Sequence, residues 1–192
     1  MLVKQCILID MNVPGLKRFV VPEDVATHFH LHAGDIVADF GAGNGFFLPV
    51  LASAVGETGR VYACEIQRPL VEKMGEFVRL KDWHHVDVLW CDLEKKNGIT
   101  IADNALDVGI LVNTLFQIED TAVALAEIHR TIRPGGRLYI IDWTESFAGM
   151  GPASSAVVSA QSAIDMCESQ GFALEREYPA GDHHYGLSFQ VI

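Results

Sequence analysis

The sequence predicts an α/β fold built on one mostly parallel β-sheet. From residue 33 onward, short β-branched runs alternate with stretches of helical periodicity, which is the pattern of βαβ units. The run Leu106–Val112 is continuously apolar, as expected of a strand that helices cover on both faces. The chain has 192 residues, 49% of them hydrophobic and 20% charged, which suffices for one domain with a full core.

Local signals place the elements in order. Five strands are expected, at 35–40, 60–65, 86–91, 106–112 and 137–142. The intervening helices are expected at 46–55, 68–80 and 121–132. Gly56 closes the first helix, because a residue without a side chain suits a helix C-terminus. The last helix buries Leu125, Ile128 and Ile132 on one face, and the sequence Arg133-Pro134-Gly135-Gly136 stops it.

The C-terminal fifth departs from this alternation. After a connection rich in Gly, Ser and Pro, Ser159 is expected to cap a helix that ends at Gly171. Two strands follow, at 172–178 and 185–192, and their connection is too short for a parallel crossover, so they are antiparallel. Residues 35–192 therefore form the domain. Residues 1–34 are an N-terminal extension, either a lid over the site or a fixed arm at the sheet edge.

Charge and cysteine content limit the possible partners. Fourteen Lys and Arg against 25 Asp and Glu give a net charge of −11, so no nucleic-acid partner is expected and a small neutral or cationic one is favoured. No run approaches the ~18 apolar residues that span a membrane, and the N-terminus lacks a signal-peptide pattern. The four cysteines form no CxxC pair, which favours a cytoplasmic location.

The turn after the first expected strand is the strongest signal of function. It reads Asp39-Phe40-Gly41-Ala42-Gly43-Asn44-Gly45. Alternate glycines let the backbone approach a ligand closely, and the following helix directs free N–H groups at it. The spacing is G-x-G-x-G, whereas dinucleotide folds have G-x-G-x-x-G. Asp39, the acid just before the glycines, is a poor neighbour for pyrophosphate but suits a ligand that carries an ammonium group.

Acids also stand at the ends of the next two strands. Glu65 ends the second strand, where it can accept both hydroxyls of a ribose. Asp92 follows the third, where it can accept a bond from an exocyclic amine. Each acid alone is more often a turn residue. Three of them beside a glycine loop indicate a site for an adenosine joined to an amino acid, at the point where the strand order reverses.

Five segments resemble the successive motifs of class I S-adenosylmethionine-dependent methyltransferases. They are VADFGAGNGFF, VYACEIQ, WCDLE, ALDVGILVNTLFQ and EIHRTIRPGGRLYIIDW. The chain is most similar to the small-molecule group that includes the ubiquinone/menaquinone-biosynthesis methyltransferases, over about residues 20–192. The resemblance implies a Rossmann-like, doubly wound sheet of seven strands in the order 3-2-1-4-5-7-6, with the last strand antiparallel. It also implies methyl transfer from S-adenosylmethionine to a small-molecule acceptor by in-line displacement.

The resemblance assigns cofactor contacts residue by residue. Asp39, Gly41, Ala42 and Gly43 would hold the methionine end, and Glu65 would take the ribose hydroxyls. The adenine would meet Ile66, Asp92 and Leu93, and Asn113 would lie beside the sulfonium. Phe40, Asn44 and Cys64 stand where the family often has other residues.

The acceptor site is expected where the last strand starts beside the end of the fifth. His184, Tyr185, Asp142 and Asn113 are the predicted catalytic groups, and His183 and Glu119 are lesser candidates. Neighbouring strand residues point to opposite faces, so Tyr185 joins His184 only if the regular strand begins after it. Alternatively, Asp142 caps a loop, or a His–Asp pair only fastens the hairpin.

Three further interpretations compete with this one. His28, His30 and His32 alternate as metal ligands do along a strand, but no carboxylate or Cys shares their spacing, so no metal is predicted. A module that binds the cofactor without turnover is the main rival function, and a blocked acceptor pocket would favour it. A dinucleotide oxidoreductase is disfavoured by the glycine spacing and the antiparallel hairpin. The pattern assigns neither the acceptor nor the oligomeric state.

Overall fold

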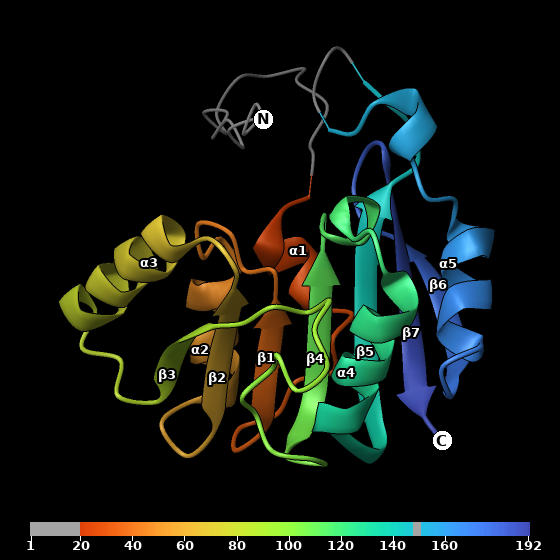
Figure 1. The fold of residues 1–192 in the computed structure, drawn as a ribbon. Coiled ribbons are helices and arrows are strands. Elements are labelled where there is room, and N and C mark those ends of the chain that lie inside the picture. Colours follow the sequence, from red (N-terminus) through yellow and green to blue (C-terminus); the bar gives the residue numbers. More distant parts are fainter. Residues whose placement is uncertain (1–19, 148–150) are drawn as a thin grey trace.

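The computed structural model describes residues 20–147 and 151–192 and has a seven-stranded sheet with helices on both faces (Figure 1). The strand order is β3-β2-β1-β4-β5-β7-β6. Strands β1 to β5 are parallel, and β7 is antiparallel to both of its neighbours. The predicted fold class, strand order and antiparallel last strand are therefore confirmed.

The strands are β1 Ile36–Phe40, β2 Arg60–Glu65, β3 Val86–Trp90, β4 Leu106–Val112, β5 Ile132–Trp143, β6 Phe172–Pro179 and β7 His184–Val191. The helices are α1 Pro22–Ala26, α2 Leu48–Val55, α3 Arg68–Leu80, α4 Thr121–Thr131 and α5 Ala160–Glu168, with 3-10 turns η1 Leu115–Gln117 and η2 Ser154–Ala156. The α5 cap is as predicted, since the Ser159 side chain accepts a bond from the Ser162 amide.

Several element boundaries differ from the predictions, and two of these differences have a clear structural cause. The helix expected from residue 46 begins at Leu48, because the glycine-rich turn continues as far as Phe47. The segment expected only to stop α4 is instead the irregular start of β5. Ile132 already pairs with Leu106, and the register shifts before Val108 pairs with Arg137.

Two buried clusters fill the layers on either side of the sheet. Helices α1, α2 and α3 cover one face, and α4 and α5 cover the other (Figure 1). Alternation along the strands divides the core, so that Val37 of β1 belongs to the first cluster and Ala38 to the second. We refer to these as the α1–α3 face and the α4–α5 face.

Residues 20–34, the described part of the N-terminal extension, pack on the α1–α3 face. Phe29 is fully buried, with its ring centroid 4.9 Å from that of Tyr139 and 6.1 Å from that of Phe47. His28 stacks on Tyr178 at 4.4 Å. These contacts place the described part of the extension on a face of the sheet, and a fixed arm at the sheet edge stays a prediction. Phe19 and the residues before it lie outside the described part, and a lid remains a prediction.

The carboxyl ends of the parallel strands meet at the upper edge of the sheet in Figure 1. Strand β7 starts at this same edge, because it runs against β5. The loops that follow β1, β2, β3, β4 and β5 are therefore gathered there, together with the turn between β6 and β7. In open α/β sheets this edge is where ligands bind.

Candidate cofactor and acceptor site

The glycine loop, residues 41–47, follows β1 in a backbone conformation that favours glycine. Gly41 and Gly43 have φ of +80° and +57°. The carbonyl of Cys64 accepts bonds from the amides of Gly41 and Ala42, at 2.8 and 2.9 Å. A Cβ on Gly41 would lie 2.6 Å from the Thr114 side chain, so the loop packs directly on the residues after β4. A Cβ on Gly43 would meet only the Gly41 carbonyl, at 3.9 Å, which leaves an open cradle.

Glu65 joins this loop to the end of β2. Its carboxylate is 6% exposed and accepts two backbone bonds, from Gly43 to Oε2 at 3.0 Å and from Gln67 to Oε1 at 2.7 Å. One oxygen of the predicted ribose acid therefore lies at the cradle, and the other lies at the start of the loop after β2. Carboxylates that accept backbone N–H bonds are held in a fixed orientation.

Asp39 lies on the same face of the sheet as Glu65. It pairs in register with Ala63, two residues before Glu65, and residues two apart on a strand share a face. Asp39 is 3% exposed. Burial, together with the neighbouring charge of Glu65, raises the pKa of Asp39 to about 7. A positive group placed beside it would favour its ionised form.

The loops after β2 and β3 place three of the predicted adenine contacts. Ile66 is half-exposed directly after Glu65, and Asp92 and Leu93 follow the end of β3. Trp90, which the sequence analysis did not single out, fixes the Ile66 backbone because its Nε1 donates to the Ile66 carbonyl at 2.7 Å. The available signal was an aromatic residue near the end of a predicted strand, two residues before the acid.

Asn113 and Thr114 follow β4, next to the glycine loop. The amide of Asn113 donates to the Ile141 carbonyl at 2.8 Å, and its φ is +52°. The Asn113 side-chain oxygen is buried and has no hydrogen-bond partner among the described residues. Buried polar atoms are normally paired, so this oxygen is available to a ligand donor.

Asp142 is bonded to the backbone around it. It is 1% exposed, its Oδ1 accepts from the Trp143 amide at 2.8 Å, and its Oδ2 accepts from the Phe116 amide at 3.3 Å. Burial raises the pKa of Asp142 to about 6, although these backbone bonds oppose the rise. These contacts are the ones that the loop-cap alternative requires, since Asp142 holds η1. A catalytic role for this residue stays a prediction.

His184 and Tyr185 lie on opposite faces of the sheet. Strand β7 already begins at His184, and Tyr185 pairs with Asp142 while His184 pairs with Trp143. Tyr185 therefore shares the α4–α5 face with Asp142, whereas His184 lies on the α1–α3 face with its ring 4.2 Å from that of Trp143. The prediction that His184 and Tyr185 both join Asp142 in one site is wrong, because it requires the regular strand to begin after Tyr185, whereas β7 begins at His184.

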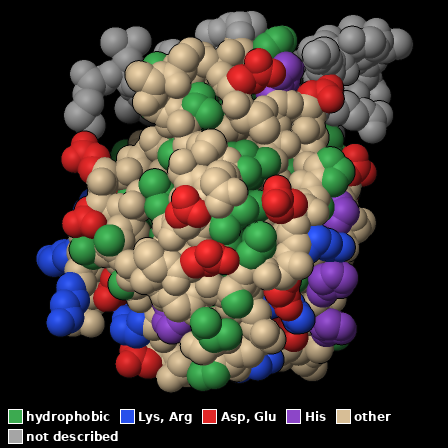
Figure 2. All heavy atoms as spheres, turned by 90° about the vertical axis from the view of Figure 1, so that its right-hand side faces the viewer, with side chains coloured by type: hydrophobic (Ala, Val, Ile, Leu, Met, Phe, Trp, Pro, Cys, Tyr) green, Lys and Arg blue, Asp and Glu red, His purple; other side chains and the backbone are tan. Residues whose placement is uncertain are grey.

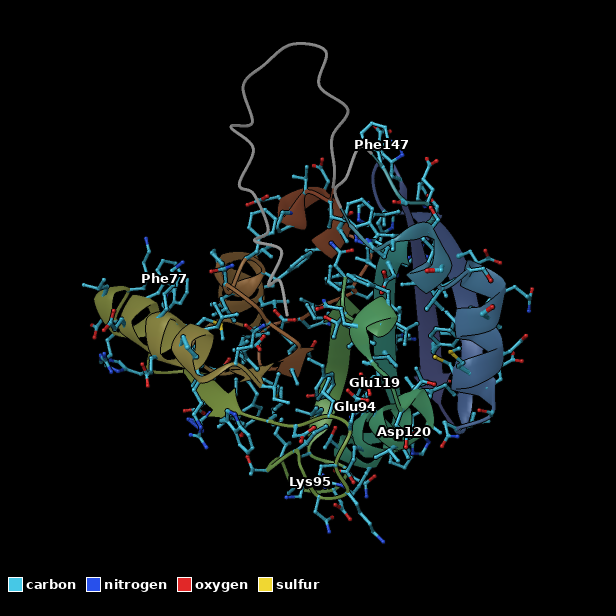
Figure 3. All side chains as sticks on the ribbon, turned by 45° about the horizontal axis from the view of Figure 1, so that its top comes forward. Phe77, Glu94, Lys95, Glu119, Asp120 and Phe147 are labelled. Carbon is cyan, nitrogen blue, oxygen red and sulfur yellow. The ribbon has the colours of Figure 1, made fainter. Side chains whose placement is uncertain are left out.

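The environments of these side chains also differ. His184 Nδ1 contacts the Asp182 carbonyl at 2.9 Å, and burial lowers the pKa of its ring. The Tyr185 hydroxyl is buried with no hydrogen-bond partner among the described residues. His183, ranked below His184 from sequence, has a carboxylate partner, since its Nδ1 lies 2.6 Å from Glu145 Oε1. Its ring stacks on Phe147, which Figure 3 labels near the top of the view.

The three alternating histidines of the extension do not converge. His28 stacks on Tyr178, and His32 lies 3.6 Å from Asp35. Over residues 20–147 and 151–192, no group of three or more His, Cys, Asp or Glu is arranged to hold a metal ion. Within the same residues, no helix has both the length and the apolar character needed to cross a membrane. Figure 2 shows one side of the surface, on which acidic and basic side chains are scattered among apolar ones.

Comparisons with known proteins agree with this geometry. A family model described as a methyltransferase domain matches residues 38–140. The ubiquinone/menaquinone biosynthesis C-methyltransferase UbiE of Burkholderia multivorans is 31% identical over 116 residues, which are 60% of this chain and 46% of that protein. The 2-phytyl-1,4-naphtoquinone methyltransferase of Nostoc punctiforme is 22% identical over 184 residues, which are 81% of this chain and 79% of that protein. The chain thus spans about half the length of the UbiE protein.

Solved structures extend the likeness to the whole fold. The crystal structure of an S-adenosylmethionine-dependent methyltransferase from Aquifex aeolicus has a TM-score of 0.83 at 30% identity and covers 91% of both chains. Geranyl diphosphate C-methyltransferase from Streptomyces coelicolor shares the fold, with a TM-score of 0.73 at 13% identity over 89% of this chain and 78% of that one. The chain therefore belongs to the family of class I S-adenosylmethionine-dependent methyltransferases, as its motifs predict, and the cofactor of this family is S-adenosylmethionine.

Proposed function

We propose that this chain transfers the methyl group of S-adenosylmethionine to a small-molecule acceptor by in-line displacement. The observation that carries the proposal is the buried pair Asp39 and Glu65, which lie on one face beside the open cradle above Gly43. Two acids buried side by side raise the cost of ionising either one, and a cationic ligand relieves that cost.

The described residues fit this cofactor. The cradle above Gly43 gives the methionine end room to approach the backbone, and Asp39 would pair with its ammonium group. The Glu65 oxygens would accept the ribose hydroxyls beside the cradle. The buried, unpartnered oxygen of Asn113 offers one more acceptor at the end of β4.

The apolar part of the cofactor has a place as well. Ile66 is 51% exposed directly after the ribose acid, so its side chain is open to a ligand. Leu93 is half-buried at the end of the neighbouring strand, so the two side chains would flank the adenine. Asp92 would accept the exocyclic amine, as the resemblance implies.

The chemistry that remains for the protein is alignment and exclusion of water. When bound, the cofactor supplies a methyl group that its sulfonium already activates. The chain holds the donor through the loops after β1, β2 and β3 and must place the acceptor opposite, near the ends of β4 and β5. A base is required only when the acceptor carries a proton that must leave. Asp142, with Tyr185 on the same face, and His183, beside Glu145, are groups at this end that could take that role.

The net charge and the free cysteines support the proposed class of acceptor and the proposed location. A net charge of −11 opposes polyanions, so we propose a small neutral or cationic acceptor and no nucleic acid. The UbiE protein is named for ubiquinone and menaquinone biosynthesis, which supports a small-molecule acceptor here. Cys64, Cys91 and Cys167 are buried free thiols, which supports the proposed cytoplasmic location.

Turnover with labelled cofactor tests the proposal. The protein would be incubated with methyl-labelled S-adenosylmethionine and sets of small phenols, quinols, amines and thiols, and transfer to one class is expected. Asp39→Asn serves as the control, because it should lose transfer while it remains folded. Binding of S-adenosylmethionine without transfer to any class would instead support a binding module without turnover.

A further inference from the structure

Glu94 joins two loops that are distant in sequence. It is the fourth residue after Trp90, which ends β3, and its exposed side chain reaches the segment just before α4. A single oxygen, Oε2, accepts from the backbone amide of Glu119 at 2.8 Å and from that of Asp120 at 2.6 Å. Figure 3 shows these three labelled residues gathered where the two loops meet.

Each loop carries one part of the cofactor site. The loop at 91–98 carries Asp92 and Leu93, the groups expected at the adenine. The loop at 113–120 carries Asn113, expected at the sulfonium, and Thr114, which packs on Gly41. In the part of the chain that the structure describes, the hydrogen bonds between these two loops all end on the Glu94 carboxylate.

The first loop keeps its shape without this carboxylate. The Asp92 amide donates to the Gly98 carbonyl at 3.2 Å, and the Gly98 amide donates to the Lys95 carbonyl at 2.7 Å. Asp92 Oδ1 accepts from the backbone amide of Glu94, at 3.1 Å, which any side chain at this position would retain. Truncating Glu94 therefore leaves the adenine end of the site in place.

The second loop has other contacts at both ends, since its start is bonded to β5 and Asp120 at its far end caps α4. The Asn113 amide bonds to Ile141, and the Phe116 amide bonds to Asp142. Its far end, at Glu119 and Asp120, is held to the first loop by Glu94. An ionised acceptor that takes two amides next to a helix N-terminus makes strong, directional bonds.

We propose that Glu94 is a positioning residue that keeps the sulfonium loop at the correct distance from the adenine loop, so that one cofactor molecule contacts both. This inference rests on the proposed function, since it requires the cofactor to span these loops. The affinity for a ligand that reaches both loops should depend on Glu94. The affinity for a ligand that occupies only the adenine and ribose end should not.

Binding of a full-length and a truncated ligand separates these cases. S-adenosylhomocysteine spans both loops, and adenosine reaches only the first. We expect Glu94→Ala to weaken the binding of S-adenosylhomocysteine about tenfold, which is the scale of one charged hydrogen bond. The same variant should weaken the binding of adenosine less than about twofold. Glu94→Gln should recover most of the affinity, because its amide oxygen can accept both N–H groups.

A matched control changes the same loop without cutting the link. The Asp120 side chain caps α4 by accepting from the Val123 amide at 3.1 Å, while its backbone amide is what Glu94 holds. Asp120→Ala should lower the melting temperature as a lost helix cap does. It should leave the affinity for both ligands unchanged.

Amide hydrogen exchange gives a readout that needs no ligand. In Glu94→Ala, residues 113–120 should exchange faster than in the wild type, while α5 should not change. Equal loss of affinity for both ligands, no loss for either, or unchanged exchange at 113–120 would overturn the role of Glu94. Wild-type protein that binds neither ligand would contradict the proposed function itself, and the exchange result would still report whether Glu94 holds the loop.

Discussion

The two halves of the carboxyl edge are built differently. In the half formed by β1, β2 and β3, the key acids Asp39 and Glu65 lie on one face and surround an open cradle. In the half formed by β5 and β7, Tyr185 and His184 lie on opposite faces. Asp142, on the same face as Tyr185, bonds to the backbone amides of its own and the neighbouring loop.

This difference has a physical cause. Under the proposed function, the first half would bind a ligand that is the same throughout the family, so short local motifs can supply every contact. The second half would have to suit one particular acceptor, and its side chains come from segments far apart in the chain. Several of its polar groups also support the scaffold, as Asp142 does for η1. Substitutions in the first half should therefore weaken cofactor binding far more than substitutions in the second half.

The largest expected effect is at Gly41. A Cβ at this position would lie 2.6 Å from the Thr114 side chain, on a residue with φ of +80°. Overpacking and backbone strain together should cost about 4 kcal/mol, so Gly41→Ala should bind S-adenosylhomocysteine about a thousandfold more weakly. Calorimetric titration measures this loss.

Gly56 provides the control for that variant. It also has a positive φ, +63°, but a Cβ there would meet nothing within 4 Å. Gly56→Ala should therefore share the strain and lose stability, yet bind S-adenosylhomocysteine as the wild type does. If both variants bound equally well, the packing of the glycine loop on Thr114 would not matter for the cofactor.

The second prediction concerns pH and Asp39. Burial raises its pKa from 3.8 to about 7 in the folded chain, so between these values the folded state holds a proton that the unfolded state has lost. The free energy of unfolding should therefore fall as pH rises from about 4 to about 7, by up to about 4 kcal/mol. Urea unfolding across this range measures the slope.

Asp39→Asn isolates this contribution. Asp142 has a pKa raised to about 6 and adds a slope of the same sign, so the wild type alone does not assign the effect. The difference in stability between wild type and Asp39→Asn should grow with pH up to about 7. A difference that is the same at every pH would rule out a buried, protonated Asp39.

The third prediction is that Glu65→Ala weakens cofactor binding by about 1–3 kcal/mol, the range for a lost hydrogen-bonded charged partner. The variant also releases the amides of Gly43 and Gln67, which the carboxylate holds at 3.0 and 2.7 Å. Glu65→Gln should lose less, because one oxygen remains. Unchanged affinity in Glu65→Ala would show that this residue does not contact the ribose.

The smallest expected effect on stability lies in the other half, at Tyr185. Its buried hydroxyl has no partner among the described residues, so Tyr185→Phe should change the free energy of unfolding by less than about 1 kcal/mol. Tyr139→Phe, at another buried unpartnered hydroxyl on the α1–α3 face, is the control. Once an acceptor is known, slower turnover in Tyr185→Phe alone would assign the hydroxyl to the acceptor site.

Much of the fold is predictable because its signals are local. Strand β2, helix α3 and strand β4 have the predicted bounds, since each is a continuous pattern between clear end signals. The start of β5 is not predictable in the same way. A Pro-Gly-Gly segment ends a helix in any context, and only the pairing of Ile132 with Leu106 makes it part of a strand.

The residues of the candidate site also differ in whether local sequence signals predict them. The sequence predicts the cradle and its two acids, because the glycines and Asp39 form one motif and Glu65 ends a predicted strand. The contact of Trp90 with Ile66 and the link from Glu94 to the loop before α4 are not predicted, because segments 24 to 26 residues apart create them. The face of His184 depends on which residue begins β7, and a shift of one residue reverses it.

Titration with S-adenosylmethionine at about pH 7, in two buffers of different ionisation enthalpy, tests the central claim most directly. The account predicts saturable binding that releases about half a proton, because the positive cofactor ionises Asp39, whose pKa is about 7 in the free chain. Asp39→Asn should release none, and NAD should give no binding heat. Binding of NAD without any response to S-adenosylmethionine would contradict the account.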